Sequence, residues 1–237
     1  MLNLIRKADN MFYETDKDDH GLAMPPFKSC VVPRPIGWIS TLSSDGVPNL
    51  APFSQFTNLT FDPPYIAISI NQGYQQNRKD TTNNIEQTGE FVYNMVSSDL
   101  KDVMNITAAE FPADVDEFEV AGIEKAPSRL VKPFRVAASP IQFECKYVQT
   151  LRLPGNGRVG TVDVIIGRVV AVHIKDEFIM EDGKIDIVKI RPLARLGYSD
   201  YTIIDSSFEI EPSKAAGERD DLSLGLQGAA GTMPKIK

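Results

Sequence analysis

The sequence predicts a mainly β fold, organised as a small closed or partly closed barrel with short helices inserted between its strands. Two observations lead to this prediction. Most apolar residues fall in short runs of strand length that are bounded by Gly, Pro, Asn and Asp. Only two longer segments combine helix start signals with apolar residues at helical spacing. About seven strands are therefore expected, and no internal repeat is visible.

The strands are predicted from alternation and from turn residues. A hairpin pairs residues 36–42 with residues 49–56 through the polar turn Ser43–Gly46. Gly167 interrupts a long apolar run and predicts a bulge of the kind that closes barrels. The Gly-rich residues 153–160 predict a hairpin loop. The remaining strands are expected at 65–70, 89–96, 141–153 and 161–174, with a small hairpin at 181–187 around an Asp-Gly turn.

Helices are expected at two places in the chain. The first covers residues 80–88, with Asp80 as its N-cap and Gly89 as its end. The second covers residues 99–109, after a Ser/Asp cap. The stretch after it is rich in Gly and Pro and predicts a surface excursion with a brief helical pattern at 116–121.

Composition and charge narrow the class of protein. The net charge is −7 and no basic run interleaves with aromatic residues, so no nucleic acid partner and no anionic membrane surface is expected. No apolar run approaches the roughly 20 residues needed to span a bilayer. No apolar core of a signal peptide can be drawn in the charged first twenty residues. We therefore expect a cytoplasmic protein in which Cys30 and Cys145 are reduced and buried.

No catalytic constellation of the usual kind is present. The carboxylates are scattered, no nucleophile elbow or P-loop occurs, and only His20 and His173 could add imidazole ligands to a metal. Residues 153–160 lack the context of a dinucleotide fingerprint. If the protein is an enzyme, its chemistry is expected to come from a bound cofactor.

Two cations precede the first predicted helix, at the end where the helix dipole is positive. Arg78 and Lys79 stand there beside the hydroxyls of Thr81 and Thr82. Cations are disfavoured at this position. One interpretation is an anion held by these groups and by free backbone N–H groups. The other interpretation is that both side chains point into water.

Small polar residues gather where the strand 49–56 ends. Ser54, Thr57, Asn58 and Thr60 could bond to the polar rim of a ligand, or could serve as ordinary turn residues. Trp38 is the single tryptophan and lies in the same hairpin. It could belong to a site, to the core or to a dimer interface.

Several blocks of the sequence together resemble the flavin reductase-like family of FMN-binding split-barrel proteins. The blocks occur in the family's order over roughly residues 25–205: PRPIGWISTLSSDGVPNLAPFSQFTNLTFDPPYIAISI, NRKDTTNNIEQTGEFVYNMV, MNITAAEFPADVDEFEVAG, APSRLVKPFRVAASPIQFEC and RPLARLGYSDY. The resemblance implies a Greek-key split β-barrel that forms a homodimer, with two FMN sites at the subunit interface. It divides the chain into an N-terminal arm (1–24), an FMN-binding domain (25–212) and a C-terminal tail (213–237).

The resemblance also implies roles for individual residues. The flavin phosphate is expected near Ser54, Arg78, Lys79 and Thr81, with Asp80 capping the helix that presents its N–H groups. The isoalloxazine ring is expected against Phe56, Thr57 and Asn58, with Trp38 and Ser40 nearby.

Three functions are compatible with this comparison. The first is an enzyme in which NAD(P)H reduces bound FMN, and the flavin then reduces free flavin or a partner oxygenase. The second is a flavin-binding electron carrier without NAD(P)H activity of its own. The third is an unliganded structural relative, which Arg78, Lys79 and Thr81 argue against because two cations at a helix start would then lack compensation.

Overall fold

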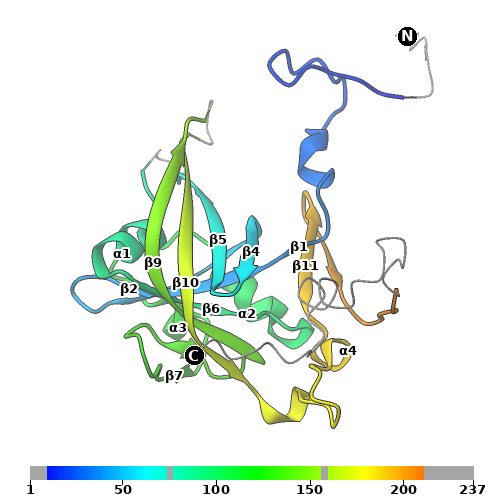
Figure 1. Cartoon of the computed structure of the whole chain (residues 1–237). Coiled ribbons are helices and arrows are strands. Elements are labelled where there is room, and N and C mark those ends of the chain that lie inside the picture. The colour runs from blue at the N-terminus through cyan, green and yellow to red at the C-terminus, as the bar shows by residue number, and fades with distance from the viewer. Residues whose placement is uncertain (1–9, 74–76, 156–159, 211–237) are drawn as a thin grey trace. The chain divides into compact units, whose positions relative to one another are not determined.

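A seven-stranded antiparallel sheet forms the centre of the fold (Figure 1). Its strands follow the order β3-β2-β6-β9-β10-β5-β4. The computed structural model describes residues 10–73, 77–155 and 160–210, and the residues up to Asp205 form one compact unit. The strands of the sheet are β2 (Gly37–Leu42), β3 (Pro48–Phe53), β4 (Phe56–Phe61), β5 (Pro64–Asn71), β6 (Glu90–Asn94), β9 (Ile141–Leu153) and β10 (Val162–Ile174).

Two smaller sheets were not predicted from the sequence, because their strands are short. One contains β1 (Arg34–Pro35), β11 (Leu193–Gly197) and β12 (Asp200–Ile203). Within it the first strand of the fold pairs with β11, far along the chain. The other pairs β7 (Lys125–Ala126) with β8 (Arg135–Val136), inside the predicted surface excursion.

The longest helix, α1 (Asp80–Thr88), has the predicted bounds and ends at Gly89 in the left-handed conformation, with φ of 73°. Its N-cap residue is Lys79 and not Asp80, which is the first helical residue and makes no capping bond. The predicted helix at 99–109 is a 3₁₀ turn, η2 (Ser98–Leu100), followed by α2 (Lys101–Ile106). The other short helices are η1 (Pro26–Ser29), α3 (Glu117–Val120), η4 (Asp176–Phe178) and α4 (Ile187–Ile190).

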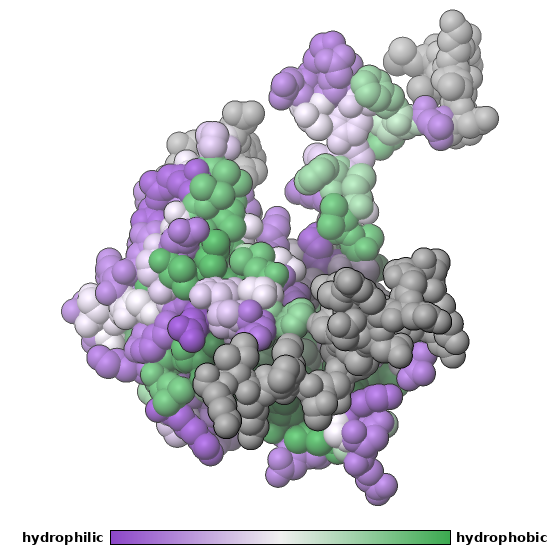
Figure 2. Space-filling model, viewed as in Figure 1, coloured by the Kyte–Doolittle hydropathy of each residue, from purple (hydrophilic) through white to green (hydrophobic). Residues whose placement is uncertain are grey.

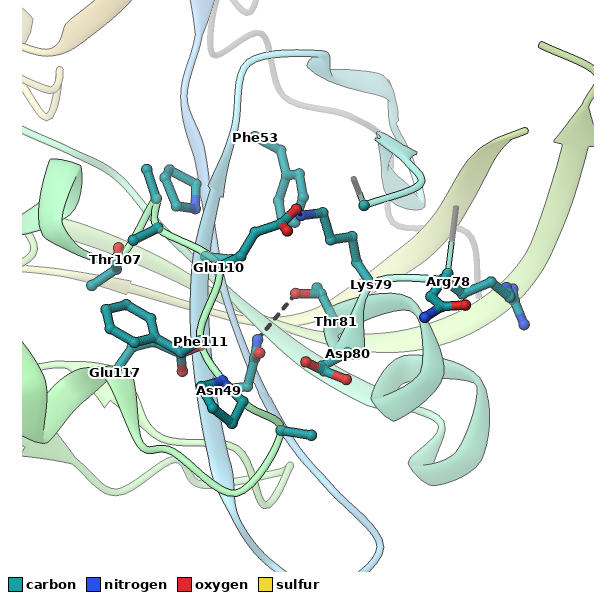
Figure 3. Close-up of a pocket in the computed structure, with 18 residues that line it drawn as sticks. Asn49, Phe53, Arg78, Lys79, Asp80, Thr81, Thr107, Glu110, Phe111 and Glu117 are labelled. Carbon is teal, nitrogen blue, oxygen red and sulfur yellow. Dashed lines mark hydrogen bonds and ion pairs between the residues drawn. The ribbon is translucent and has the colours of Figure 1, made fainter. Parts of the chain in front are cut away.

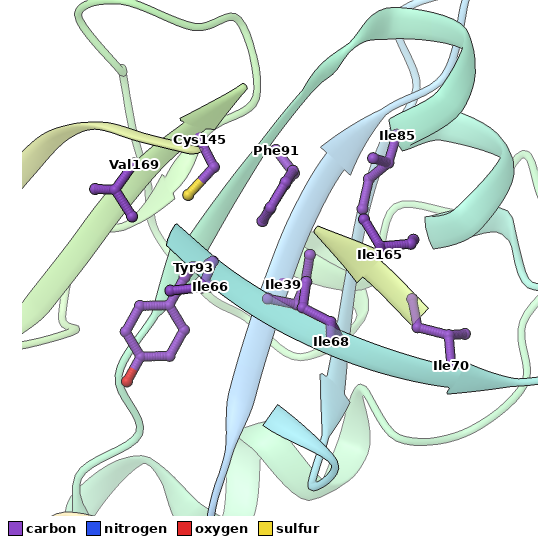
Figure 4. Close-up of a cluster of buried hydrophobic side chains, with 10 residues drawn as sticks. All are labelled: Ile39, Ile66, Ile68, Ile70, Ile85, Phe91, Tyr93, Cys145, Ile165 and Val169. Carbon is purple, nitrogen blue, oxygen red and sulfur yellow. The ribbon is translucent and has the colours of Figure 1, made fainter. Parts of the chain in front are cut away.

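Both faces of the strand β2 are buried, because neighbouring residues point to opposite sides of a sheet. Ile39 belongs to one apolar cluster, together with Phe91, Cys145 and Ile165 from three other elements (Figure 4). Trp38 belongs to a second apolar cluster. This second cluster also contains Leu50, Met104, Phe118 and Leu193.

Gly167 lies at a bulge, as predicted. The register between β9 and β10 shifts between Ile166 and Gly167. A Cβ atom at Gly167 would lie 2.2 Å from Cζ of Phe91. The absence of a side chain at Gly167 therefore leaves room for the buried ring of Phe91 against the strand.

Several other predictions need correction. The strand expected at 49–56 ends at Phe53, and residues 56–61 form the separate edge strand β4 instead of a turn. The hairpin expected at 181–187 reduces to a single bridge between Ile179 and Ile185. Cys30 is exposed after η1, whereas Cys145 is buried as expected.

Part of the predicted loop at 153–160 and the tail 213–237 lie outside the described residues. No helix in the described parts of the chain is long and apolar enough to cross a membrane.

Candidate functional site

A cavity of about 620 Å³ lies between the start of α1, the strand β3 and the segment that follows α2 (Figure 3). Its lining combines cations, carboxylates, amides and an apolar wall. The residues that line it are Asn49, Ala51, Pro52, Phe53, Gly73, Asn77, Arg78, Lys79, Asp80, Thr81, Thr107–Ala113 and Glu117.

The start of α1 lines this cavity with Lys79, Asp80 and Thr81. The first intrahelical bond runs from the Asn83 N–H to the Lys79 carbonyl, at 3.1 Å. The three preceding N–H groups, of residues 80–82, therefore have no acceptor within the helix. The buried hydroxyl of Thr81 accepts a hydrogen bond from the Asn49 amide at 3.0 Å, which fixes the helix start against β3.

Arg78 joins the helix to the long strands of the sheet. Its two terminal nitrogens donate to the Glu86 carboxylate at 2.7 and 2.6 Å, and its Nε donates to Asp163 on β10 at 3.0 Å. The hydrogen bond with Glu86 raises the pKa of Arg78 and lowers that of Glu86, in both cases against the effect of burial. In Figure 3 the Arg78 side chain extends away from Lys79 and Glu110.

Lys79 forms an ion pair with Glu110 across the cavity (Figure 3). The two side chains are 32% and 41% exposed. An ion pair that is this accessible to water is worth about 0–1 kcal/mol. Lys79 can therefore exchange Glu110 for another anion at little cost.

These three ion pairs correct an expectation drawn from the sequence. Arg78 and Lys79 do not lack compensation at the helix start, because each has a carboxylate partner within the chain. The cations alone therefore do not argue against an unliganded relative.

Glu117 is a nearly buried carboxyl group in the cavity wall. It is 7% exposed, and its Oε2 accepts the Leu50 N–H at 3.0 Å. Burial raises the pKa of Glu117, the charges of Asp116 and Asp80 raise it further, and the bond from Leu50 works in the opposite direction.

The cavity brings together four of the ten residues expected from the sequence: Arg78, Lys79, Asp80 and Thr81. Ser54 lies between β3 and β4 and does not line it. Sequence reasoning missed Asn49, Asn77, Glu117 and the segment 107–113. The one local signal available was at Asn49, a polar residue at the second position of β3, close to the turn that precedes this strand.

The residues expected at the flavin ring lie outside this cavity. Phe56 stacks on Tyr93 in the core, with ring centroids 4.6 Å apart. Thr57 and Asn58 are exposed on the edge strand β4. Ser40 is buried and donates to the Phe134 carbonyl.

Trp38 is fully buried, and its indole Nε1 donates to the Thr107 hydroxyl at 2.9 Å. Thr107 lines the cavity. Trp38 therefore supports the cavity wall from behind.

The chain belongs to the flavin reductase-like family. Residues 29–188 match the flavin reductase like domain. This is a flavin-binding family, and its name implies oxidoreductase activity.

Individual relatives agree with this assignment. An uncharacterised protein of Aquifex aeolicus is 40% identical over 171 residues, which are 72% of this chain and 84% of the relative. The crystal structure of nitrilotriacetate monooxygenase component B from Bacillus cereus has a TM-score of 0.74 and 28% identity, over 86% of this chain and 98% of that one. A candidate flavin reductase with a split barrel domain from Shewanella frigidimarina has a TM-score of 0.72 and 23% identity, over 86% and 100% of the two chains, and shows the same fold.

Proposed function

We propose that this protein binds FMN and acts as an NAD(P)H-dependent flavin oxidoreductase, whose reduced flavin passes electrons to free flavin or to a partner oxygenase. The observation that carries the proposal is the cavity at the start of α1, where an exchangeable cation and free backbone N–H groups converge. Membership of a flavin-binding family supports the choice of ligand.

The chemistry of the helix start fits a phosphate group. The N–H groups of residues 80–82 and the Lys79 ammonium are the donors that an anion needs, and the helix dipole favours negative charge there. Lys79 binds the phosphate when its pair with Glu110 opens. Arg78 acts differently from the expectation: by holding Glu86 and Asp163, it fixes the helix that presents these donors.

The size of the cavity is suitable for the cofactor. Its 620 Å³ lies within the roughly 300–1,000 Å³ of small-molecule sites. Ala51, Pro52 and Phe53 offer an apolar wall beside the polar helix start.

The ring is proposed to extend towards β4, where Thr57 and Asn58 are exposed and accessible to it. Bound FMN supplies the hydride-accepting chemistry. The residues of this chain bind it, orient it and limit its contact with water, which agrees with a site without an acid–base triad.

A homodimer is part of the proposal. Figure 2 shows apolar residues gathered along β9 and β10 on the visible face. Val148, Leu151 and Leu153 on β9 are 47%, 54% and 43% exposed. A second copy of the chain would cover such a surface.

The similarity to nitrilotriacetate monooxygenase component B supports a partner oxygenase. The name of that protein describes it as one component of a monooxygenase.

The test is the visible spectrum of the purified protein, before and after anaerobic addition of NADH or NADPH. We expect flavin absorption that bleaches with one or both nicotinamides. A yellow protein that bleaches only with dithionite would favour the electron carrier instead. A colourless protein that cannot be reconstituted with FMN would refute flavin binding altogether.

A further inference from the structure

A second cavity of about 440 Å³ lies where β9 and β10 meet the segment 129–137. Three cations line it, Arg129, Arg135 and Lys175, together with His173 on β10. His173 is ten residues along β10 from Asp163, the partner of Arg78. At about 3.3 Å per residue, the two sites are separated by roughly 33 Å along the strand. The second cavity is therefore distinct from the candidate flavin site.

Two of the three cations of this cavity, Arg135 and Lys175, donate to neutral groups. The Arg135 guanidinium donates to the Pro127 carbonyl at 3.2 and 2.9 Å and to the Gln142 amide oxygen at 3.2 Å. The Lys175 ammonium donates to the Ala138 carbonyl at 2.9 Å. Within the described residues none of the three forms an ion pair with a carboxylate, although the chain has a net charge of −7.

The contrast with other cations of the protein is informative. Arg78, Lys79, Lys125 and Lys146 each have a carboxylate partner. Within the second cavity the exposed Arg129 repels the partly buried Arg135. Burial lowers the pKa of Arg135, and the neighbouring Arg129 lowers it further, against the attraction of Glu144.

One buried carboxylate organises this cavity. Glu144 is fully buried and accepts the N–H groups of Arg129, Leu130 and Val131 at 2.8, 2.5 and 3.1 Å. Its Oε1 also lies 2.6 Å from Nε2 of His173. Glu144 therefore fixes both the loop that carries Arg129 and the imidazole ring. Three cations line the cavity against this one carboxylate, so positive charge remains in excess there.

We propose that this second cavity binds the phosphate group of a small phosphorylated molecule. Arg129, Arg135 and Lys175 would hold the phosphate, because guanidinium and ammonium groups form strong charge-assisted bonds with its oxygens. Val172 and Ile174 offer apolar contact to the rest of the ligand. A cavity of 440 Å³ has the size for a compact small molecule. The net charge of −7 makes a nucleic acid an unsuitable ligand.

The experiment uses the full-length protein with AMP and inorganic phosphate as separate probes, and measures binding by isothermal titration calorimetry. The variants are Arg129→Gln and Lys175→Gln, with Arg129→Lys as the charge-conserving form. Arg168→Gln is the matched control, because Arg168 is exposed on the same strand and does not line the cavity. Lys79→Ala separates this cavity from the candidate flavin site.

We expect each Gln variant to weaken AMP binding at least about tenfold, whereas Arg129→Lys retains most of it and Arg168→Gln leaves it unchanged. Lys79→Ala removes any AMP bound at the candidate flavin site and retains the binding at the second cavity. Tighter binding of AMP than of inorganic phosphate would support contact with the organic part, and equal binding would assign recognition to the phosphate alone. Absence of binding for both probes at millimolar concentration would overturn the proposal. Equal affinity in wild type and both Gln variants, or loss of binding in Lys79→Ala, would overturn it as well. Because no readout involves flavin, the result is independent of the proposed function.

Discussion

Replacing Lys79 by alanine should weaken the binding of FMN far more than that of riboflavin, which lacks the phosphate. The structure sets the size of the effect. A charge-assisted contact with phosphate is worth about 1.5–3 kcal/mol, but Lys79 must first leave Glu110, a pair worth about 0–1 kcal/mol at this exposure. The net loss is about 0.5–3 kcal/mol, and its middle range of about 1–2 kcal/mol is roughly a 5- to 30-fold weaker affinity for FMN.

Glu110→Gln provides the opposite perturbation. It removes the carboxylate that competes with the phosphate for Lys79, so the affinity for FMN should rise by up to about fivefold, the equivalent of about 1 kcal/mol. Riboflavin affinity should change little in both variants.

The assay is a titration of each apoprotein with FMN and with riboflavin, followed by the flavin fluorescence. Lys101→Ala serves as the control, because Lys101 is exposed, pairs with Asp102 and does not line the cavity. Equal losses for both ligands in Lys79→Ala would refute the assignment of Lys79 to the phosphate.

Three further outcomes are expected. Arg78→Ala should lower the free energy of unfolding by about 1–3 kcal/mol even without flavin, because it removes a partner of the buried Asp163. Urea denaturation should detect this loss, and Lys79→Ala should show no such loss. The pKa of Glu117 is raised in the folded state, so just above pH 4.5 the folded protein binds more protons than the unfolded one. Stability should therefore fall as the pH rises through this window. Glu117→Gln should remove that fall in thermal melts recorded against pH. Asn58→Leu should lower the midpoint potential of bound FMN by some tens of millivolts in a redox titration, since about 30 mV corresponds to 1.4 kcal/mol for two electrons, and an unchanged potential would show that the amide of Asn58 does not contact the ring.

The long strands of the sheet could be predicted from the sequence because their signals are local. The prediction of 141–153 matches β9 residue for residue, and Gly167 marked the bulge in β10. The edge strand β4 was missed because Thr57, Asn58 and Thr60 resemble turn residues. An edge strand with exposed side chains needs no apolar alternation, so the pattern that identifies buried strands is absent there.

The candidate site could be predicted only where its residues are consecutive. Lys79 and Thr81 follow from the start signals of one helix. Their partners depend on the fold: Glu110 is 31 residues from Lys79, and Asp163 is 85 residues from Arg78. No local rule connects residues at such separations, so the sequence indicated uncompensated cations where the folded chain pairs each of them.

The position of Trp38 gives the protein an intrinsic optical probe. It is the single tryptophan of the chain, it is shielded from solvent, and one hydrogen bond through Thr107 separates it from the cavity. All indole emission therefore originates beside the wall of the candidate site. Flavins absorb light in the range where buried indoles emit, so occupancy of the cavity would quench this emission without any added label. Binding and release of ligand could then be followed in stopped-flow experiments on the unmodified protein.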